Sequence, residues 1–246
     1  MLKQEDLVRE AAEYKKDANK RFNAALAALL ALAWRYKRLG EGFTFDADPD
    51  LYADALAICR DMSDGCAEDA KARLQRVMEN LDYAYMDDAW DYAQSEYEGS
   101  DMLTRFDMAG SHLLDLLTLW IILAFKEGWS EPYTRITILR YLNNPFASGM
   151  FKKVDKSLLQ WGRGYDKNIW SQLTLIGQNG IIGGARYGEW MDAAQSGATY
   201  YIRRRGSSYP CEMCEDAANI PIPIDQPFDY LHSRCMCYPE YHFEPL

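Results

Sequence analysis

A cluster of cysteine and histidine near the carboxyl end limits how this chain can fold more than any other feature. Two cysteines separated by two residues are followed, after a short loop, by a histidine and two more cysteines: Cys211, Cys214, His232, Cys235 and Cys237. Thiolate and imidazole are the ligands that zinc prefers, and two such pairs can close a tetrahedral site with little help from the rest of the fold. The sequence therefore predicts a zinc-binding knuckle over residues 211–237.

Four of these five side chains would complete a closed structural site, which leaves no position for a catalytic water. We expect Cys211, Cys214 and His232 to be ligands. We expect Cys235 and Cys237 to compete for the fourth position, on the reasoning that only one side chain of a Cys-x-Cys strand faces a given side. A sulfur-rich tetrahedral site with one imidazole favours zinc over iron, although the spacing itself admits either metal.

Two disulfides, or a set of buried thiols, are the alternative interpretation of the same cysteines. Disulfide frameworks are typical of small secreted domains, whereas this chain has 246 residues and six cysteines, of which Cys59 and Cys66 lie in a region of helical pattern. The apolar residues 24–34 follow a long charged segment, so we expect no export signal and synthesis in the cytosol, where thiols stay reduced. Both points favour the metal.

The first 145 residues have apolar side chains at helical spacing and no strand-like segment. The pattern, with its capping and breaking residues, predicts helices that end near Gly40, run from Pro49 to Gly65, and cover residues 70–85, 103–125 and 131–142. The apolar run 113–125 contains Asp115 and is too short to cross ~30 Å of hydrocarbon, so we expect a core helix and no membrane span.

Glycines interrupt the pattern after Pro145, and short helices are predicted around residues 169–176 and 185–194. Residues 177–188 lack the preceding strand and the Gly-Lys-Ser/Thr ending of a phosphate loop, so turns and close helix packing are expected there. Residues 198–205 alternate like a strand. The sequence thus predicts a mainly α protein: a helical domain over 1–145 that docks partners, then a small α+β module over 146–246 that carries the Cys/His zinc knuckle.

Charge is unevenly distributed along the chain. The formal net charge is −10, residues 41–101 are dense in Asp and Glu, and residues 152–205 lean basic. This argues against a general nucleic-acid binder and for a protein with two different faces. Arg203, Arg204 and Arg205 are candidate contacts to DNA phosphates or to an acidic neighbour, and the alternative is that they protect the edge of a strand.

The last hundred residues or so follow a recognisable order. A strand ending in basic residues precedes a Cys-x-x-Cys turn, a proline-containing loop, and a final His-x-x-Cys-x-Cys before another strand. This order resembles the carboxy-terminal domain of the Mu F-like minor head proteins of tailed bacteriophages. The family ending is usually His-Pro-x-Cys-Arg-Cys, whereas Ser233 and Met236 stand at its proline and arginine positions. Pro210 replaces the usual Thr before the first cysteine, and residues 215–217 replace an Asp-Gly after the second.

What the resemblance implies is a structural role in the virion head. A Mu F-like protein would be made in the host cytoplasm, bind portal or capsid proteins near the portal vertex in a few copies, and form an oligomer set by the virion. Contact with packaged DNA and entry into the host with the genome are further implications. The amino-terminal helices carry no such resemblance, and neither copy number nor their partner can be read from the sequence.

A small metal-dependent nuclease or hydrolase is the alternative from another class. Catalytic zinc needs a water and a nearby base, and the candidates close in sequence are His242, Glu212, Glu215, Asp216 and Glu240. The chain lacks the His-Glu-x-x-His, His-x-Glu, Gly-x-Ser-x-Gly and Walker patterns, so we expect no enzyme and no catalytic residues. A phage-delivered effector is a third reading, carried by the resemblance alone.

Overall fold

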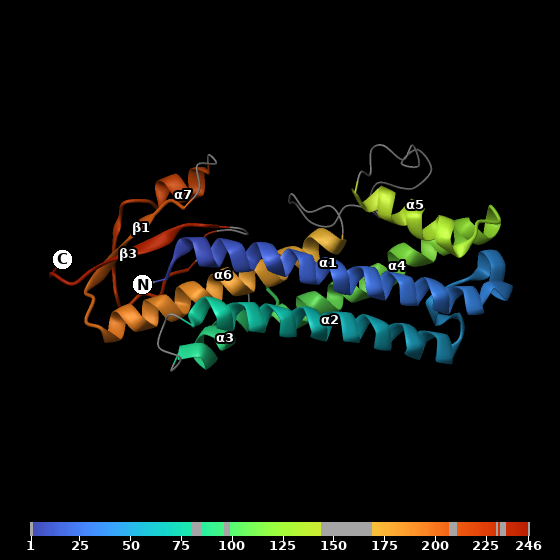
Figure 1. The fold of residues 1–246 in the computed structure, drawn as a ribbon, viewed down its shortest axis with the longest axis horizontal. Coiled ribbons are helices and arrows are strands. Elements are labelled where there is room, and N and C mark those ends of the chain that lie inside the picture. The colour runs from blue at the N-terminus through green and yellow to red at the C-terminus, as the bar shows by residue number, and fades with distance from the viewer. Residues whose placement is uncertain are drawn as a thin grey trace. The chain divides into compact units, whose positions relative to one another are not determined.

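The computed structural model describes residues 2–79, 85–95, 99–143, 169–206, 211–229, 231 and 235–245. Figure 1 shows a mainly helical chain with a small antiparallel sheet near its carboxyl end. The helices are α1 (Gln4–Arg35), α2 (Pro49–Met78), α3 (Met86–Gln94), α4 (Met102–Lys126), α5 (Glu131–Asn143), α6 (Ile169–Gln195) and α7 (Glu212–Asp216). Two 3-10 turns, Lys37–Gly42 and Phe45–Ala47, join α1 to α2. The strands are β1 (Tyr200–Arg204), β2 (Pro221–Pro223) and β3 (Tyr238–His242). The predicted fold class, mainly α with a small α+β carboxyl-terminal part, is confirmed.

The chain divides into two compact units, each built from segments that are distant in sequence. Unit 1 comprises Met1–Lys15, Glu68–Met102 and Leu175–Leu246, and unit 2 comprises Lys16–Ala67 and Leu103–Thr174. Unit 1 therefore joins segments from both sides of the predicted domain boundary. The boundary at residue 145 lies outside the described residues, and the division into 1–145 and 146–246 stays a prediction.

Side-chain caps fix two helix starts where the sequence predicts them. Asp48 precedes α2, and its Oδ1 accepts hydrogen bonds from the backbone N–H groups of Asp50, at 3.0 Å, and Leu51, at 3.1 Å. Ser130 precedes α5, and its Oγ accepts one from the N–H of Tyr133 at 3.4 Å. The first N–H groups of a helix have no intrahelical partner, so each cap stabilises its helix locally.

Two helices continue where glycines were expected to stop them. α2 passes through Gly65, where an added Cβ would lie 2.7 Å from the guanidinium carbon of Arg21. α6 is continuous over the predicted turns, and a Cβ on Gly184 would lie 2.7 Å from the carbonyl oxygen of Ala89. A helical glycine costs about 0.5–1 kcal/mol relative to alanine, but here it allows a neighbouring element to approach closely. The predicted turns are wrong, and the predicted close packing is confirmed.

In unit 1, partly buried polar contacts connect α1 to α2 and α6. Arg73 Nη1 on α2 donates to Glu10 Oε2 on α1 at 2.9 Å, and Gln178 Nε2 on α6 donates to the carbonyl oxygen of Ala11 at 2.8 Å. Burial disfavours the charged form of Glu10, but hydrogen bonds from Arg73 and Arg9 outweigh it and lower the pKa of the carboxyl. These contacts order the first turns of α1.

In unit 2, an aromatic group and buried hydrogen bonds hold the helices. The ring of Phe125 on α4 meets those of Trp34 and Phe43 edge-on, with centroids 5.1 and 5.7 Å apart. Ser63 Oγ on α2 donates to the carbonyl oxygen of Phe106 on α4 at 3.1 Å. The α2 and α4 backbones therefore lie close together within this unit.

Helix α4 is long and apolar enough to cross a membrane, by length and composition only. That is weak evidence, since the core helix of a soluble protein passes the same test. Buried side chains recur along α4 at helical spacing, namely Phe106, Leu113, Leu117 and Ile121. The expectation of a core helix without a membrane span stays a prediction.

The sheet has the order β2-β1-β3, with both pairs antiparallel. Tyr201 on β1 lies opposite Ile222 on β2 and Tyr241 on β3. Burial alternates along β1, so that Tyr201 and Arg203 are buried on one face. Trp190 Nε1 on α6 donates to the carbonyl oxygen of Ile224 at 2.9 Å and so joins α6 to the segment after β2.

Candidate metal centre

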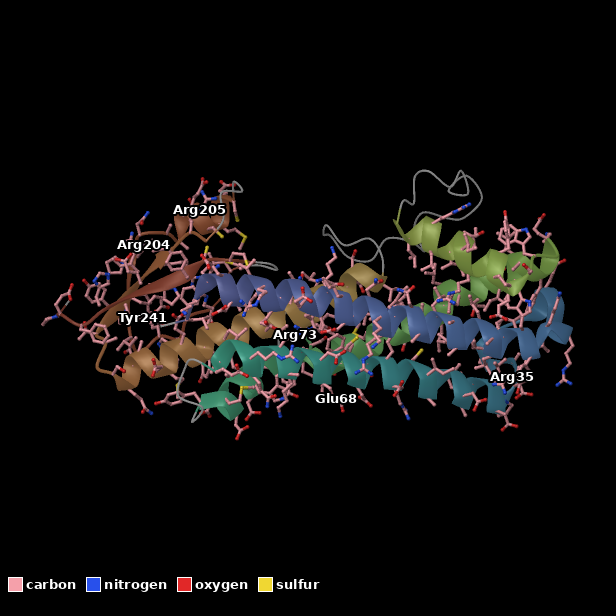
Figure 2. The ribbon with its side chains drawn as sticks, in the orientation of Figure 1. Arg35, Glu68, Arg73, Arg204, Arg205 and Tyr241 are labelled. Carbon is pink, nitrogen blue, oxygen red and sulfur yellow. The ribbon has the colours of Figure 1, made fainter. Side chains whose placement is uncertain are left out.

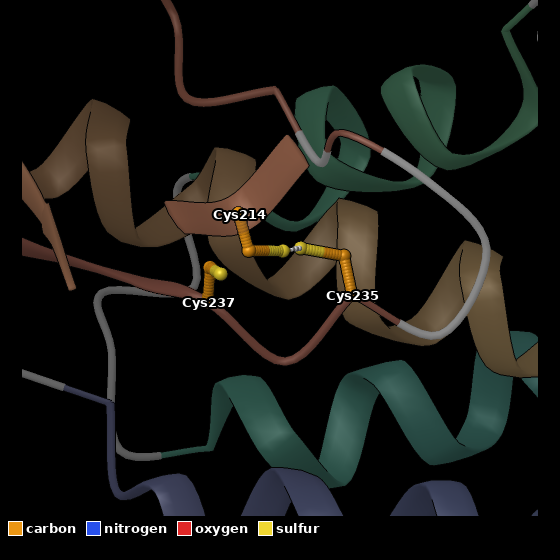
Figure 3. Close-up of side chains that lie close together, drawn as sticks. All are labelled: Cys214, Cys235 and Cys237. Atoms are coloured by element: carbon orange, nitrogen blue, oxygen red, sulfur yellow. Dashed lines mark hydrogen bonds between the residues drawn. The ribbon is translucent and has the colours of Figure 1, made fainter. Parts of the chain in front are cut away.

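Cys214 meets Cys235 and Cys237, which lie more than twenty residues later in the sequence, beside the sheet. Cys214 lies on α7, and Cys235 and Cys237 lie in the segment that leads into β3. The sulfur atoms of this thiol cluster (Cys214, Cys235 and Cys237) all lie within 4.8 Å of one another. Figure 3 shows Cys214 and Cys235 pointing toward each other, with their Sγ atoms 3.8 Å apart. The thiol cluster could hold a metal ion.

The spacing fits zinc better than a disulfide. Tetrahedral zinc with metal–sulfur bonds of about 2.3 Å separates its sulfur ligands by about 3.8 Å, which is the Cys214–Cys235 separation. A disulfide would need the two sulfur atoms about 2.05 Å apart, and all six cysteines are free thiols in the structure. The donor set therefore suits a soft divalent metal.

The thiol cluster is shielded from water. Its cysteines are between 2% and 5% exposed and pack with Tyr201 and Phe228 in one small apolar core. Cys211 is half-buried and packs against this core. A metal held here would have its ligands surrounded by apolar side chains, as in a structural centre, and little room for a reacting water.

The pKa values of the three thiols shift in different directions. Burial raises the pKa of the Cys214 thiol to about 12. A hydrogen bond from Cys237 is the main cause that lowers the pKa of Cys235 to about 5, and the same contact raises the pKa of Cys237. The hydrogen bond from Cys237 therefore favours the thiolate form of Cys235.

The sulfur atoms of Cys235 and Cys237 both belong to the thiol cluster, and which of the two binds a metal stays a prediction. Side chains two residues apart in extended chain point to the same face, so a Cys-x-Cys segment presents both thiols together. Cys211 lies beside Cys214, whose pKa its thiol helps to raise, but it falls outside the group of three. His232 lies outside the described residues, and its role as a ligand stays a prediction.

Two residues that the sequence did not indicate hold the Cys235–Cys237 segment. Gln4 Nε2 on α1 donates to the carbonyl oxygen of Met236 at 3.3 Å. Gly206, which follows β1, faces the same carbonyl so closely that a Cβ would overlap it. Gln4 and Met236 are 232 positions apart, so no local pattern could have paired them.

The three arginines predicted as a contact surface have separate surroundings, and Figure 2 labels two of them, Arg204 and Arg205. Arg204 forms a two-pronged pair with Glu240, at 2.6 Å and 3.2 Å, and Arg205 Nη1 lies 2.6 Å from Glu215 Oε1. Arg203 is only 4% exposed. Strand alternation would have predicted this burial, since Arg203 stands two residues after Tyr201. Contact of these arginines with DNA or a partner stays a prediction.

None of the residues considered as a catalytic base belongs to the thiol cluster. His242 stacks on Tyr200 with centroids 4.6 Å apart, and its ring nitrogens lie 3.3 Å from Glu240 and 3.2 Å from Glu244. In β3 these side chains alternate with Tyr241, so His242 and Glu240 occupy the sheet face opposite Tyr201. The remaining candidates, Glu212, Glu215 and Asp216, are exposed on α7.

Comparisons with protein-family models, with curated proteins and with solved structures find no match to this chain.

Proposed function

We propose that this chain is a structural protein whose carboxyl-terminal part is closed by a zinc ion. The observation that carries the proposal is the thiol cluster: three buried sulfur atoms within 4.8 Å of one another, one pair of them 3.8 Å apart, surrounded by apolar side chains. His232 and Cys211 are the proposed sources of a fourth ligand. Zinc would contribute folding free energy directly, because the unfolded chain offers no preformed site.

The structural role that we propose is that of a minor head protein at the portal vertex of a tailed bacteriophage. Support comes from the order of elements that resembles the Mu F-like carboxyl-terminal domain. A helical unit with a compact, metal-closed module suits a protein that docks on other proteins inside a DNA-filled shell. The proposal includes portal or capsid proteins as partners, the virion as location, and no enzymatic activity.

The zinc centre is tested by metal analysis of the purified full-length protein. We expect about one zinc per chain for wild type, and loss of that zinc on Cys214→Ser. Cys59→Ser is the matched control, because burial raises the pKa of the Cys59 thiol to about 12 and keeps it protonated within unit 2. Wild-type protein without stoichiometric metal, after purification under reducing conditions without chelator, would exclude the proposed centre.

The virion role is tested by quantitative mass spectrometry of purified, nuclease-treated particles. We expect the chain at a fixed, low ratio to the portal protein. Its absence from particles that contain portal and capsid proteins would exclude the virion role and leave the metal centre unaffected.

A further inference from the structure

The guanidinium of Arg203 is buried against the thiol cluster's own apolar core. Its central carbon lies 4.2 Å from the ring centre of Phe228, and Phe228 packs with the three cysteines in that core. Stacking of a guanidinium on an aromatic ring is worth about 0.5–2 kcal/mol. This contact orients Arg203, but it supplies no acceptor for its N–H groups.

Arg203 carries a buried positive charge whose hydrogen bonds are incomplete. Its Nε and Nη1 atoms are buried and have no partner among the described residues. Other arginines of unit 1 are paired: Arg186 with Glu189 at 2.7 Å, and Arg204 with Glu240 at 2.6 Å. A buried cation is strongly disfavoured unless an anion lies nearby, so the position of Arg203 needs one.

The strand register places a ligand cysteine next to Arg203. Arg203 lies opposite Pro239, and Cys237 stands two residues before Pro239, which makes it the diagonal neighbour of Arg203. Diagonal neighbours have Cα atoms about 7–8 Å apart, within reach of a long side chain. If the side-chain alternation of β3 is extended back to Cys237, this cysteine lies on the same sheet face as Tyr201 and Arg203. Its packing with Tyr201 in the small apolar core agrees with that placement.

A zinc ion bound by three thiolates and one neutral ligand has a net charge of about −1, and with four thiolates about −2. Such a centre would be the anion that the buried guanidinium lacks. We propose that Arg203 is the counter-charge of the metal–thiolate centre. It acts as a positioning residue, and its buried positive charge stabilises the anionic zinc complex. This inference rests on the metal centre proposed above.

Two substitutions separate charge from packing. Arg203→Met keeps an apolar side chain on Phe228 but removes the charge, and Arg203→Lys keeps the charge but loses the planar stack. Arg204→Met is the control, because Arg204 is on the other sheet face and is paired with Glu240. Zinc affinity of each full-length protein is measured by competition with a chromogenic chelator.

We expect Arg203→Met to weaken zinc binding about 10–100-fold, the usual effect of losing a residue that supports metal ligands. Arg203→Lys should bind zinc more tightly than Arg203→Met. Arg204→Met should bind zinc with an affinity close to that of wild type. Wild-type affinity in Arg203→Met, or a lysine variant that binds no better than the methionine variant, would overturn the counter-charge. Wild type that binds no zinc would instead overturn the metal centre itself.

Discussion

Replacing Glu189 by alanine is expected to destabilise unit 1 by about 3–5 kcal/mol, the usual loss when one partner of a buried ion pair is removed. Arg186 Nη1 and Glu189 Oε2 are 2.7 Å apart, and their side chains are 2% and 4% exposed. Glu189 Oε1 also accepts the backbone N–H of Leu2 at 2.9 Å. Among the described residues, the substitution would leave a buried cation with Gln4 as a hydrogen-bond acceptor and the ring of Tyr238 as a cation–π contact, and it would remove the acceptor of the Leu2 amide.

Removing both charges should be much less harmful than removing one. Burial raises the pKa of the Glu189 carboxyl although Arg186 and the N–H of Leu2 act in the opposite direction, so desolvation exceeds the gain from pairing. Apolar replacement of a buried pair is often neutral or stabilising for that reason. The double variant Arg186→Met, Glu189→Leu should therefore recover most of the stability that Glu189→Ala loses.

The assay is equilibrium unfolding in urea followed by far-UV circular dichroism, with hydrogen exchange of the α6 amides from Leu175 onward as the measurement specific to unit 1. Glu215→Ala is the control, because its pair with Arg205 is partly exposed (53% and 29%) and should contribute no more than about 1 kcal/mol. A loss below about 1 kcal/mol for Glu189→Ala, or a double variant less stable than the single one, would refute the reasoning.

Three further predictions concern pH, packing and metal. Glu10→Gln should destabilise the protein by about 1.5–3 kcal/mol at pH 7, because charge-assisted hydrogen bonds are lost. Because the pKa of Glu10 is lowered in the folded protein, its charged carboxylate stabilises the fold above the pKa that Glu10 has in the unfolded chain. This stabilisation is lost as pH falls through the pKa of the folded state. The difference in stability between wild type and Glu10→Gln should therefore shrink below about pH 4. Gly184→Ala should cost about 1–3 kcal/mol through overpacking, against little change for Gly42→Ala, where nothing lies within 4 Å. Chelator treatment should lower the protease resistance of residues 199–245 in wild type.

Each of these has an outcome that contradicts it. Unfolding midpoints of wild type and Glu10→Gln that differ equally at pH 7 and well below pH 4 would show that the charge of Glu10 is not what stabilises α1. Equal midpoints for the two glycine variants would show that α6 can move away from α3 without loss. Proteolysis that is unchanged by chelator, in protein shown to contain zinc, would show that the metal does not support the fold.

Much of the helical architecture could be read from short-range patterns. The cap at Asp48 and the cap at Ser130 act within three residues of themselves, so the starts of α2 and α5 follow from the sequence alone. The same holds for β1, whose alternation is visible in residues 198–205. Gly65 and Gly184 misled the prediction, because a glycine ends a helix or admits a neighbour depending on what packs against it.

For the candidate centre, the sequence by itself determined the candidate ligand types and the short spacing of Cys211 from Cys214 and of Cys235 from Cys237. Only the tertiary structure decided that Cys214, Cys235 and Cys237 converge, and that Gln4 holds the carbonyl between two of them. It also decided that one of three consecutive arginines is buried against Phe228, in the core that holds the thiols, while the next two pair with glutamates. Caps and ligand spacings depend on a few neighbouring residues, whereas burial and long-range contacts depend on which distant segments fold together.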